Sequence, residues 1–203
     1  MQWMTLFQKE ILENWRNYKW IWVPLVITAL MIMDPIVNYY LPEILDKLGG
    51  LPEGAIFEIP VPTAEEAIMM SLAQLGTLGI LLFVLIGMGT ITEERKSGVA
   101  EMILTKPVNY VNYVTSKWVS TVLLVLSSFA LGLLMTWYYV NILYERIPFL
   151  TIIQVFLFYS LILTIIVTVV IFFNTMFKSQ GIVAFLSLLL IILTSTISAI
   201  FFS

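Results

Sequence analysis

The chain contains no cysteine and no histidine. Disulfide bonds, thiol chemistry and metal binding through His or Cys are therefore excluded, and so are Ser-His and Cys-His catalytic pairs. The sequence also lacks a Walker A glycine loop, which indicates that the chain does not bind ATP itself. Charged residues make up only 11% of the chain, about half the share that the surface of a soluble domain requires.

Long runs without any charged residue take up most of the chain. They cover 67–92, 118–144, 147–177 and 179–203. Each run is long enough for one helix of about 20 apolar residues, which is what crosses the hydrocarbon core. A fifth span is expected over Trp20–Tyr40, with Asp34 toward one end. In lipid the backbone must satisfy its own hydrogen bonds, so the sequence predicts an all-α integral membrane protein with five spans in one domain, 1–203.

The basic residues are unevenly divided between the two sides of these five spans. If the N-terminus is cytoplasmic, eight of the ten basic residues lie inside, and only Lys47 and Arg146 lie outside. The positive-inside rule therefore predicts a multi-pass protein of the cell membrane with a cytoplasmic N-terminus. Residues 42–66, with their prolines and Gly49-Gly50, are then an extracellular loop, either a gate over the spans or an ordinary connector.

The first 18 residues carry apolar side chains at spacings of three and four, from Met4 to Tyr18. Charged and amide side chains fill the opposite face. This pattern predicts an amphipathic helix in the inner membrane interface, because the charged face would be costly in hydrocarbon. The alternative is that residues 1–18 are the cytoplasmic start of a long first span.

The loop between the second and third spans is the most informative segment. A cluster of both signs of charge, Thr92–Lys96, is followed by apolar residues and then by Pro107. Because proline disfavours helix in the residue before it, a short helix should end near Thr105. Such a segment, 91–109, is too short and too charged to span. It either docks on a protein partner or only anchors Arg95 and Lys96 at lipid headgroups.

Three segments together resemble the type-2 ABC exporter permease family. The first is Phe7–Arg16, a Lys-Glu pair followed by an Arg ahead of the first span. The second is Glu93–Gly98, followed by Leu104, Pro107 and Lys117, and the third is Met176–Ser179. Two features depart from the family pattern. Asn109 and Tyr110 stand where a basic residue is common, and five spans are visible where the family has six, so a final span is expected to be missing from this sequence.

The resemblance implies a permease that pairs with a second permease subunit, as a homo- or heterodimer. Two copies of a separate ATPase would bind ATP and Mg²⁺, and this chain would bind no cofactor. The implied partner-binding residues of the coupling segment are Glu93, Glu94, Arg95, Lys96, Gly98, Glu101, Leu104 and Pro107. The implied interfacial-helix residues are Phe7, Lys9, Glu10, Ile11, Trp15 and Arg16.

The predicted function is export of an amphipathic or hydrophobic substrate, because the spans offer mostly apolar side chains to any path between them. Asp34 is a candidate pathway residue, since an ionisable residue within a span is a functional hypothesis by default. The alternative is that it is an outer-end residue beside a proline kink. A non-transporting immunity, sensor or assembly protein is the competing function. No nucleic-acid partner is expected, and a lone intramembrane Asp does not suit an aspartyl enzyme, which needs two acids.

Overall fold

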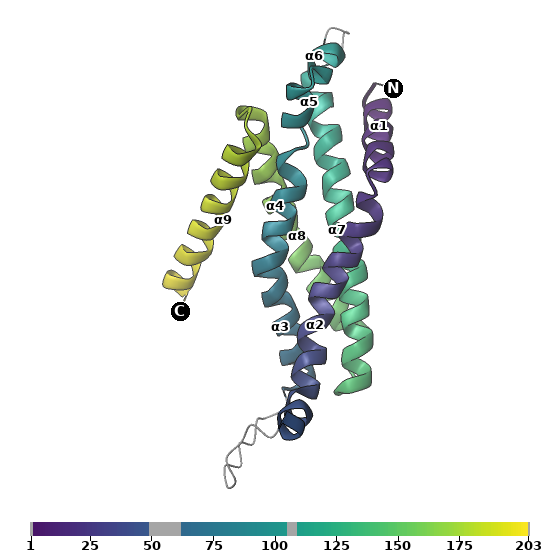
Figure 1. The fold of residues 1–203 in the computed structure, drawn as a ribbon, viewed down its shortest axis with the longest axis vertical. Coiled ribbons are helices and arrows are strands. Elements are labelled where there is room, and N and C mark those ends of the chain that lie inside the picture. The colour runs from purple at the N-terminus through teal and green to yellow at the C-terminus, as the bar shows by residue number, and fades with distance from the viewer. Residues whose placement is uncertain (1, 49–61, 105–108, 203) are drawn as a thin grey trace. The chain divides into compact units, whose positions relative to one another are not determined.

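A computed structural model describes residues 2–48, 62–104 and 109–202, and every regular element among these residues is helical (Figure 1). Side chains are described for the same residues except 45–48, 101, 103–104 and 198–202. In chain order the helices are α1 (Gln2–Arg16), α2 (Lys19–Leu48), α3 (Ala64–Gln74), the π-helix η1 (Leu75–Gly79), α4 (Ile80–Met88), α5 (Thr92–Lys96), α6 (Val99–Leu104), α7 (Tyr110–Leu143), α8 (Phe149–Met176) and α9 (Gln180–Phe202).

Five helical stretches of the described residues are long and apolar enough to cross a membrane. They are Lys19–Ile44, Ala64–Lys96, Tyr110–Leu143, Phe149–Met176 and Gln180–Ile197. This confirms the predicted all-α polytopic architecture. The spans are helical because a buried chain in lipid has no other way to pair every N–H and C=O except a closed barrel.

The first span is longer than expected. α2 continues through Asp34, Pro35 and Pro42 and ends at Leu48, so it takes up the first residues of the predicted loop 42–66. A proline removes only one backbone donor, and helices in membranes tolerate that loss. As a result Asp34 does not lie toward the end of its helix, since fourteen helical residues (48 − 34) follow it.

The second span begins slightly earlier than its charge-free run. Thr63 caps α3 in a reciprocal box, in which its hydroxyl accepts from the Glu66 amide and the Glu66 carboxylate accepts from the Thr63 amide. This arrangement satisfies two donors that a helix start leaves unpaired. The span then contains one wide turn, η1, where the Thr77 hydroxyl donates to the carbonyls of Ala73 and Gln74.

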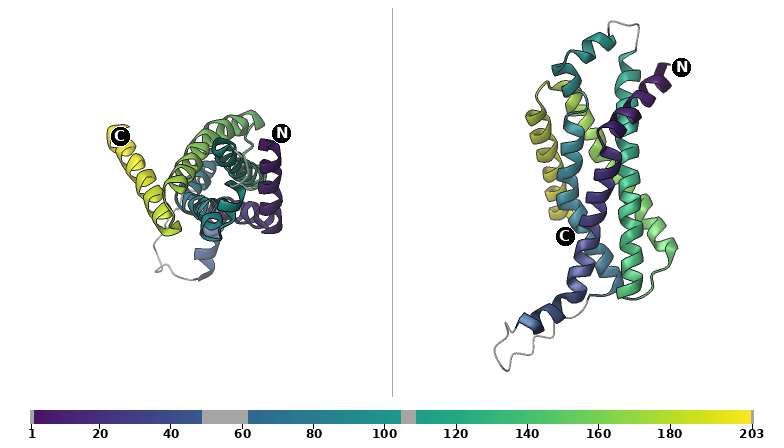
Figure 2. Two further views of the ribbon diagram at one scale, coloured as in Figure 1. Left: turned by 90° about the horizontal axis from the view of Figure 1, so that it is seen from above. Right: turned by 45° about the vertical axis from the view of Figure 1, so that its right-hand side comes forward.

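The chain groups into two compact units. The first consists of Met1–Trp22, Ile80–Leu126 and Tyr159–Ser203, and the second consists of Val23–Gly79 and Ser127–Phe158. In the first unit α9 packs on α4 (Figures 1 and 2), around a core of Val84, Val170 and Val183. In the second unit Gly132 of α7 lies against Ile27 and Met31 of α2.

Candidate functional site

Polar and charged side chains from three separate helices of the first unit meet around Glu94 of the predicted coupling segment. We call this group the ionic cluster. It consists of Lys9, Glu10 and Glu13 of α1, Glu94 of α5, and Tyr113 and Lys117 of α7.

The two lysines join the carboxylates of different helices. The Nζ atom of Lys117 lies 2.9 Å from Oε1 of Glu10 and 3.1 Å from Oε1 of Glu94. Lys9 is paired with Glu94, and its Nζ lies 3.0 Å from Oε2 of Glu13. The Tyr113 hydroxyl donates to the other oxygen of Glu94 at 2.5 Å. Glu94 is therefore held by three donors from α1 and α7.

Most of the ionic cluster is shielded from solvent. Lys117 is 1% exposed, Tyr113 2%, Glu10 6% and Glu94 7%. Burial of charge is costly unless each ion is paired, and removing one partner of a buried pair typically costs about 3–5 kcal/mol. The cluster is thus a rigid junction, whose members stabilise one another and cannot be changed singly without loss.

Lys9 is the more accessible of the two lysines in the cluster. Burial acts to lower the pKa of Lys9, but the hydrogen bonds to Glu94 and Glu13 and the charges of Glu10 and Glu94 act in the opposite direction and leave this pKa raised above its ordinary value. Lys9 therefore stays protonated at any physiological pH. The carboxylates of Glu10, Glu13 and Glu94 converge closely enough to suggest a metal site, yet all three already accept from Lys9.

Local sequence explains why the cluster forms. Tyr113 and Lys117 are four residues apart on α7, so they project from the same face of the helix. Two further bonds fix α1 against α7: Trp3 donates to Thr115 at 3.1 Å and Asn14 donates to Ser120 at 3.0 Å. Tyr18 has a φ of 55°, which interrupts the helical conformation between α1 and α2. This left-handed turn separates α1 from the first span as a distinct helix.

A buried asparagine holds the start of α5 in place. Asn174 of α8 is fully buried, and its Oδ1 accepts from the amides of Ile91 and Thr92 at 3.3 and 3.0 Å. Its Nδ2 donates to the carbonyl of Gly87 at 2.5 Å. One side chain therefore satisfies backbone groups at the end of α4 and at the beginning of α5. This is the polar partner that buried backbone groups require.

The turn between α5 and α6 depends on glycine. Gly98 has a φ of 74°, a conformation in which a side chain is strained,. Two side-chain bonds brace α5 from outside the ionic cluster. Arg95 donates to the Tyr110 hydroxyl at 3.1 Å, and Gln180 donates to Glu93 at 3.0 Å. The predicted coupling segment is therefore tied to α7 and to the start of α9.

Other residues of this segment face outward. Lys96 is exposed, Val99 is 38% exposed and Met102 is 71% exposed. Val99 and Met102 are three residues apart on α6 and so share one face. We call these three residues the outer face of the coupling segment. The outer face combines apolar surface with a positive charge and is accessible to a partner. Glu94 of the same segment is buried and points toward α1 and α7.

The predicted site residues fall into separate environments. Lys9, Glu10 and Glu94 join the ionic cluster, whereas Glu93 and Arg95 brace α5. Of the remaining residues of α1, Phe7 stacks on Trp3 with ring centroids 5.2 Å apart, Ile11 is half-buried, and Trp15 and Arg16 are exposed. The side chains of Glu101 and Leu104, and Pro107 as a whole, lie outside the described residues.

Asp34 lies in the second unit and is partly buried. Its carbonyl accepts from Asn38 at 2.9 Å, and Asn38 also lies 3.5 Å from the sulfur of Met70 in α3. The residue is thus on the side of α2 that faces α3. Its role in a pathway stays a prediction.

Sequence reasoning did not assign a role to Tyr113, Lys117, Asn174 or Gln180. Lys117 enters the sequence argument only as part of the family resemblance, and the structure buries it. Asn174 could have been singled out, because an amide inside an otherwise apolar span must find a partner. Nothing in the sequence near Tyr113 indicates that its hydroxyl reaches Glu94.

Comparisons with known proteins agree with this architecture. The sequence model described as ABC-2 family transporter protein matches residues 57–203. An uncharacterized transmembrane protein, YxlG of Bacillus subtilis (strain 168), is 35% identical over 178 residues, which is 88% of this chain and 69% of that protein. No solved structure matches the chain.

The helical spans and the family match define a multi-pass membrane permease. The chain belongs to the ABC-2 transporter family. It is a membrane permease subunit of an ABC transporter and is not itself catalytic.

Proposed function

We propose that this chain is the permease of an ATP-driven exporter that moves an amphipathic or hydrophobic substrate out of the cell by alternating access. Two permease subunits and two copies of a separate ATPase would form the complex, and the ATPase would carry ATP and Mg²⁺. The N-terminus and segment 91–109 would lie on the cytoplasmic side of the plasma membrane. The distribution of basic residues supports this orientation,.

The observation that carries the proposal is the ionic cluster. A docking segment can drive transport only if its displacement reaches the spans, and Glu94 is bound to Lys117 and Tyr113 of α7 and to Lys9 of α1. Because these contacts are buried and charged, α5 cannot move without either carrying α7 and α1 with it or breaking the cluster. The junction therefore suits transmission of a push from a bound ATPase.

The outer face of the coupling segment is the surface that we propose for ATPase docking. Met102 and Val99 supply apolar area, and Lys96 supplies a charge that sets orientation more than affinity,. Glu94 is a poor probe of docking, because its replacement would also break the ionic cluster. The test therefore belongs on α6.

Met102→Asp should lower recovery of the ATPase with the affinity-tagged chain by about tenfold, or about 1.4 kcal/mol, as expected if Met102 is an apolar hot spot of the docking surface. The measurement is purification of the complex from native membranes, with the captured ATPase identified by the Walker A loop in its sequence. Met102→Leu keeps the apolar contact and should recover the ATPase as the unchanged chain does.

If Met102→Asp recovered as much ATPase as Met102→Leu and the unchanged chain do, α6 would not be part of the docking surface. Absence of any Walker A protein from the unchanged chain's complex would instead count against ATPase coupling and favour a non-transporting role. The two outcomes separate an error in the docking residues from an error in the function.

A further inference from the structure

A polar hollow of about 510 Å³ lies against the C-terminal half of α1, just before the membrane-spanning helix α2 begins. We call it the α1 hollow. The described residues that line it are Lys9, Leu12, Glu13, Arg16 and Asn17, all from α1 or the turn that follows it. The α1 hollow lies within the first unit, which includes Met1–Trp22.

The position of the α1 hollow along the chain sets its depth in the membrane. Arg16 and Asn17 come within three residues of Lys19, where the membrane-spanning stretch Lys19–Ile44 begins. Residues directly before an apolar span lie at the boundary between hydrocarbon and water. Trp15 and Tyr18, which flank this turn, are 61% and 68% exposed, and such rings favour that boundary. The α1 hollow is therefore at the level of the lipid headgroups.

The helix beside the α1 hollow has one face on protein and another that is open. Glu10 and Asn14 bond to α7. Met4, Leu12 and Trp15 recur at helical spacing on the opposite side, and they are 53%, 61% and 61% exposed. An amphipathic helix of this kind binds a membrane through its apolar area and through attraction between its cations and acidic lipids. The apolar face indicates lipid, and the charges decide which lipid.

Two cations at the α1 hollow have no acidic partner among the described residues. Arg16 is exposed and Lys19 is half-buried, and the ion pairs of the first unit include neither. Glu13, one turn before Arg16, is already bound by Lys9 at 3.0 Å. The ionic cluster holds three carboxylates and two lysines, and Arg16 and Lys19 more than offset its one surplus negative charge. The junction of α1 and α2 thus offers positive charge to an anion.

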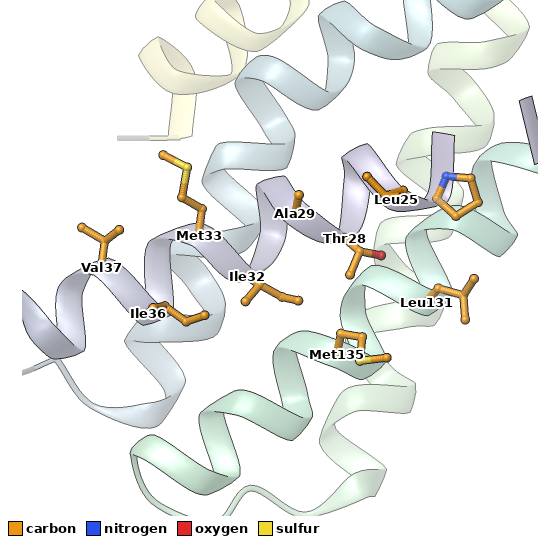
Figure 3. Close-up of a pocket in the computed structure, with 10 residues that line it drawn as sticks. Leu25, Thr28, Ala29, Ile32, Met33, Ile36, Val37, Leu131 and Met135 are labelled. Atoms are coloured by element: carbon orange, nitrogen blue, oxygen red, sulfur yellow. The ribbon is translucent and has the colours of Figure 1, made fainter. Parts of the chain in front are cut away.

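The α1 hollow differs in kind from an apolar groove of about 570 Å³ along α2 and α7 in the second unit (Figure 3). Among the residues drawn in Figure 3, Thr28 is the single one with a polar side chain, and none can ionise. An apolar lining accepts any hydrocarbon alike. The lining of the α1 hollow distinguishes between ligands, because a charge attracts one sign and repels the other.

A phosphodiester satisfies the donors at the α1 hollow. The guanidinium of Arg16 can give two parallel hydrogen bonds to two oxygens of one phosphate, and the Asn17 amide can donate another. Lys19 supplies a further positive charge at the same depth. Leu12 gives the glycerol and first methylene groups an apolar wall. These features select a phosphate that is attached to hydrocarbon.

We propose that the α1 hollow binds the headgroup of an acidic glycerophospholipid, with its phosphate on Arg16 and its acyl chains along Leu12 and Trp15. The bound lipid would fix the end of α1 at the membrane, beside the ionic cluster. The proposal requires only that α2 spans the membrane, so it does not depend on the exporter function.

The test is native mass spectrometry of the full chain, released from micelles that contain phosphatidylglycerol and phosphatidylcholine in equal amounts. The chain should retain phosphatidylglycerol in preference and saturate at one tightly bound lipid. Arg16→Gln should lower the affinity for phosphatidylglycerol about fivefold, the effect of one cation near an acidic headgroup. Arg16→Lys should lower it less, because it keeps the charge but loses the planar pair of donors.

Lys178→Gln is the matched control. Lys178 is exposed and comes directly before another membrane-spanning stretch, Gln180–Ile197, but it does not line the α1 hollow. Its replacement should leave the affinity unchanged. An equal loss in Lys178→Gln and Arg16→Gln would show a general attraction between cations and acidic lipid and overturn the proposal. Equal retention of the two lipids by the unchanged chain would overturn it as well.

Unfolding measurements separate lipid binding from a role inside the protein. In phosphatidylcholine micelles alone, Arg16→Gln should unfold at the same denaturant concentration as the unchanged chain, and added phosphatidylglycerol should raise that concentration for the unchanged chain only. Earlier unfolding of Arg16→Gln without phosphatidylglycerol would mean that Arg16 balances the ionic cluster, against the proposal. Glycerophosphoglycerol, the headgroup without acyl chains, should not displace the lipid. Displacement would identify a soluble phosphate as the ligand and overturn the assignment to lipid.

Discussion

Lys117 shows how far a single side chain can link distant parts of a sequence. Its ammonium group binds Glu10, 107 positions away, and also Glu94. The cation–π contact with Tyr113, 5.3 Å from Nζ to the ring centroid, places the charge over the neighbouring side chain of its own helix,. The residue is therefore the meeting point of α1, α5 and α7.

Lys117→Met should lower the free energy of unfolding by about 3–5 kcal/mol, because Glu10 and Glu94 would be left buried with one fewer cation. The measurement is unfolding of the purified chain in detergent. Lys178→Met is the control, since Lys178 is exposed and surface changes usually stay within about 0.5 kcal/mol.

A second variant separates charge from packing. Adding Glu10→Gln to Lys117→Met should recover part of the loss, since the two residues share one network and their effects do not add. An equal loss for Lys178→Met and Lys117→Met would contradict the importance of the cluster.

At the scale of elements, the turn between the short helices α5 and α6 depends on the backbone conformation of one residue. Gly98 provides the left-handed turn that redirects the chain between them, and none of the described residues places an atom within 4 Å of where its Cβ would be. The glycine is thus required for its φ of 74° and not for space. This distinguishes it from Gly87, where a Cβ would meet Val170 at 2.7 Å.

Gly98→Ala should destabilise the α5–α6 turn by about 1–2 kcal/mol, the cost of a left-handed conformation for a residue with a side chain. Amide hydrogen exchange at Met102, whose N–H is bonded to the Gly98 carbonyl at 3.2 Å, should become about tenfold faster. Gly181→Ala is the matched control, because Gly181 has no left-handed φ and ample room. Unchanged exchange in Gly98→Ala would show that the turn tolerates a side chain.

At the scale of the whole molecule, the number and type of spans could be predicted from where charges are absent. In hydrocarbon an unpaired charge is costly, and so is a backbone N–H or C=O group without a hydrogen-bond partner. The extension of α2 to Leu48 could not, since proline and Asp34 both suggested an end to the helix. The ionic cluster could not be predicted from the sequence either, because it forms only when α1 packs along α7. Charge patterning indicated that Glu94 matters, but it suggested an outward role for a residue that the fold turns inward.

The absence of cysteine makes the predicted orientation directly testable. Single substitutions Lys178→Cys and Glu145→Cys place a thiol at two exposed positions. A membrane-impermeant maleimide should label Glu145→Cys in intact cells, and Lys178→Cys only after the membrane is opened. The reverse pattern would place the N-terminus outside and put segment 91–109 on the wrong side for a cytoplasmic ATPase.

Gly132 also limits how this sequence can diverge. Because a Cβ at this position would meet the sulfur of Met31 at 2.7 Å and a methyl of Ile27 at 3.3 Å, a larger residue there requires the Met31 side chain to move or to be replaced by a smaller one. Substitutions at positions 31 and 132 are therefore expected to be coupled, because the side chain at one position occupies the space that the other would need. In an evolving lineage, the distance between α2 and α7 would change most readily through paired substitutions at these two positions.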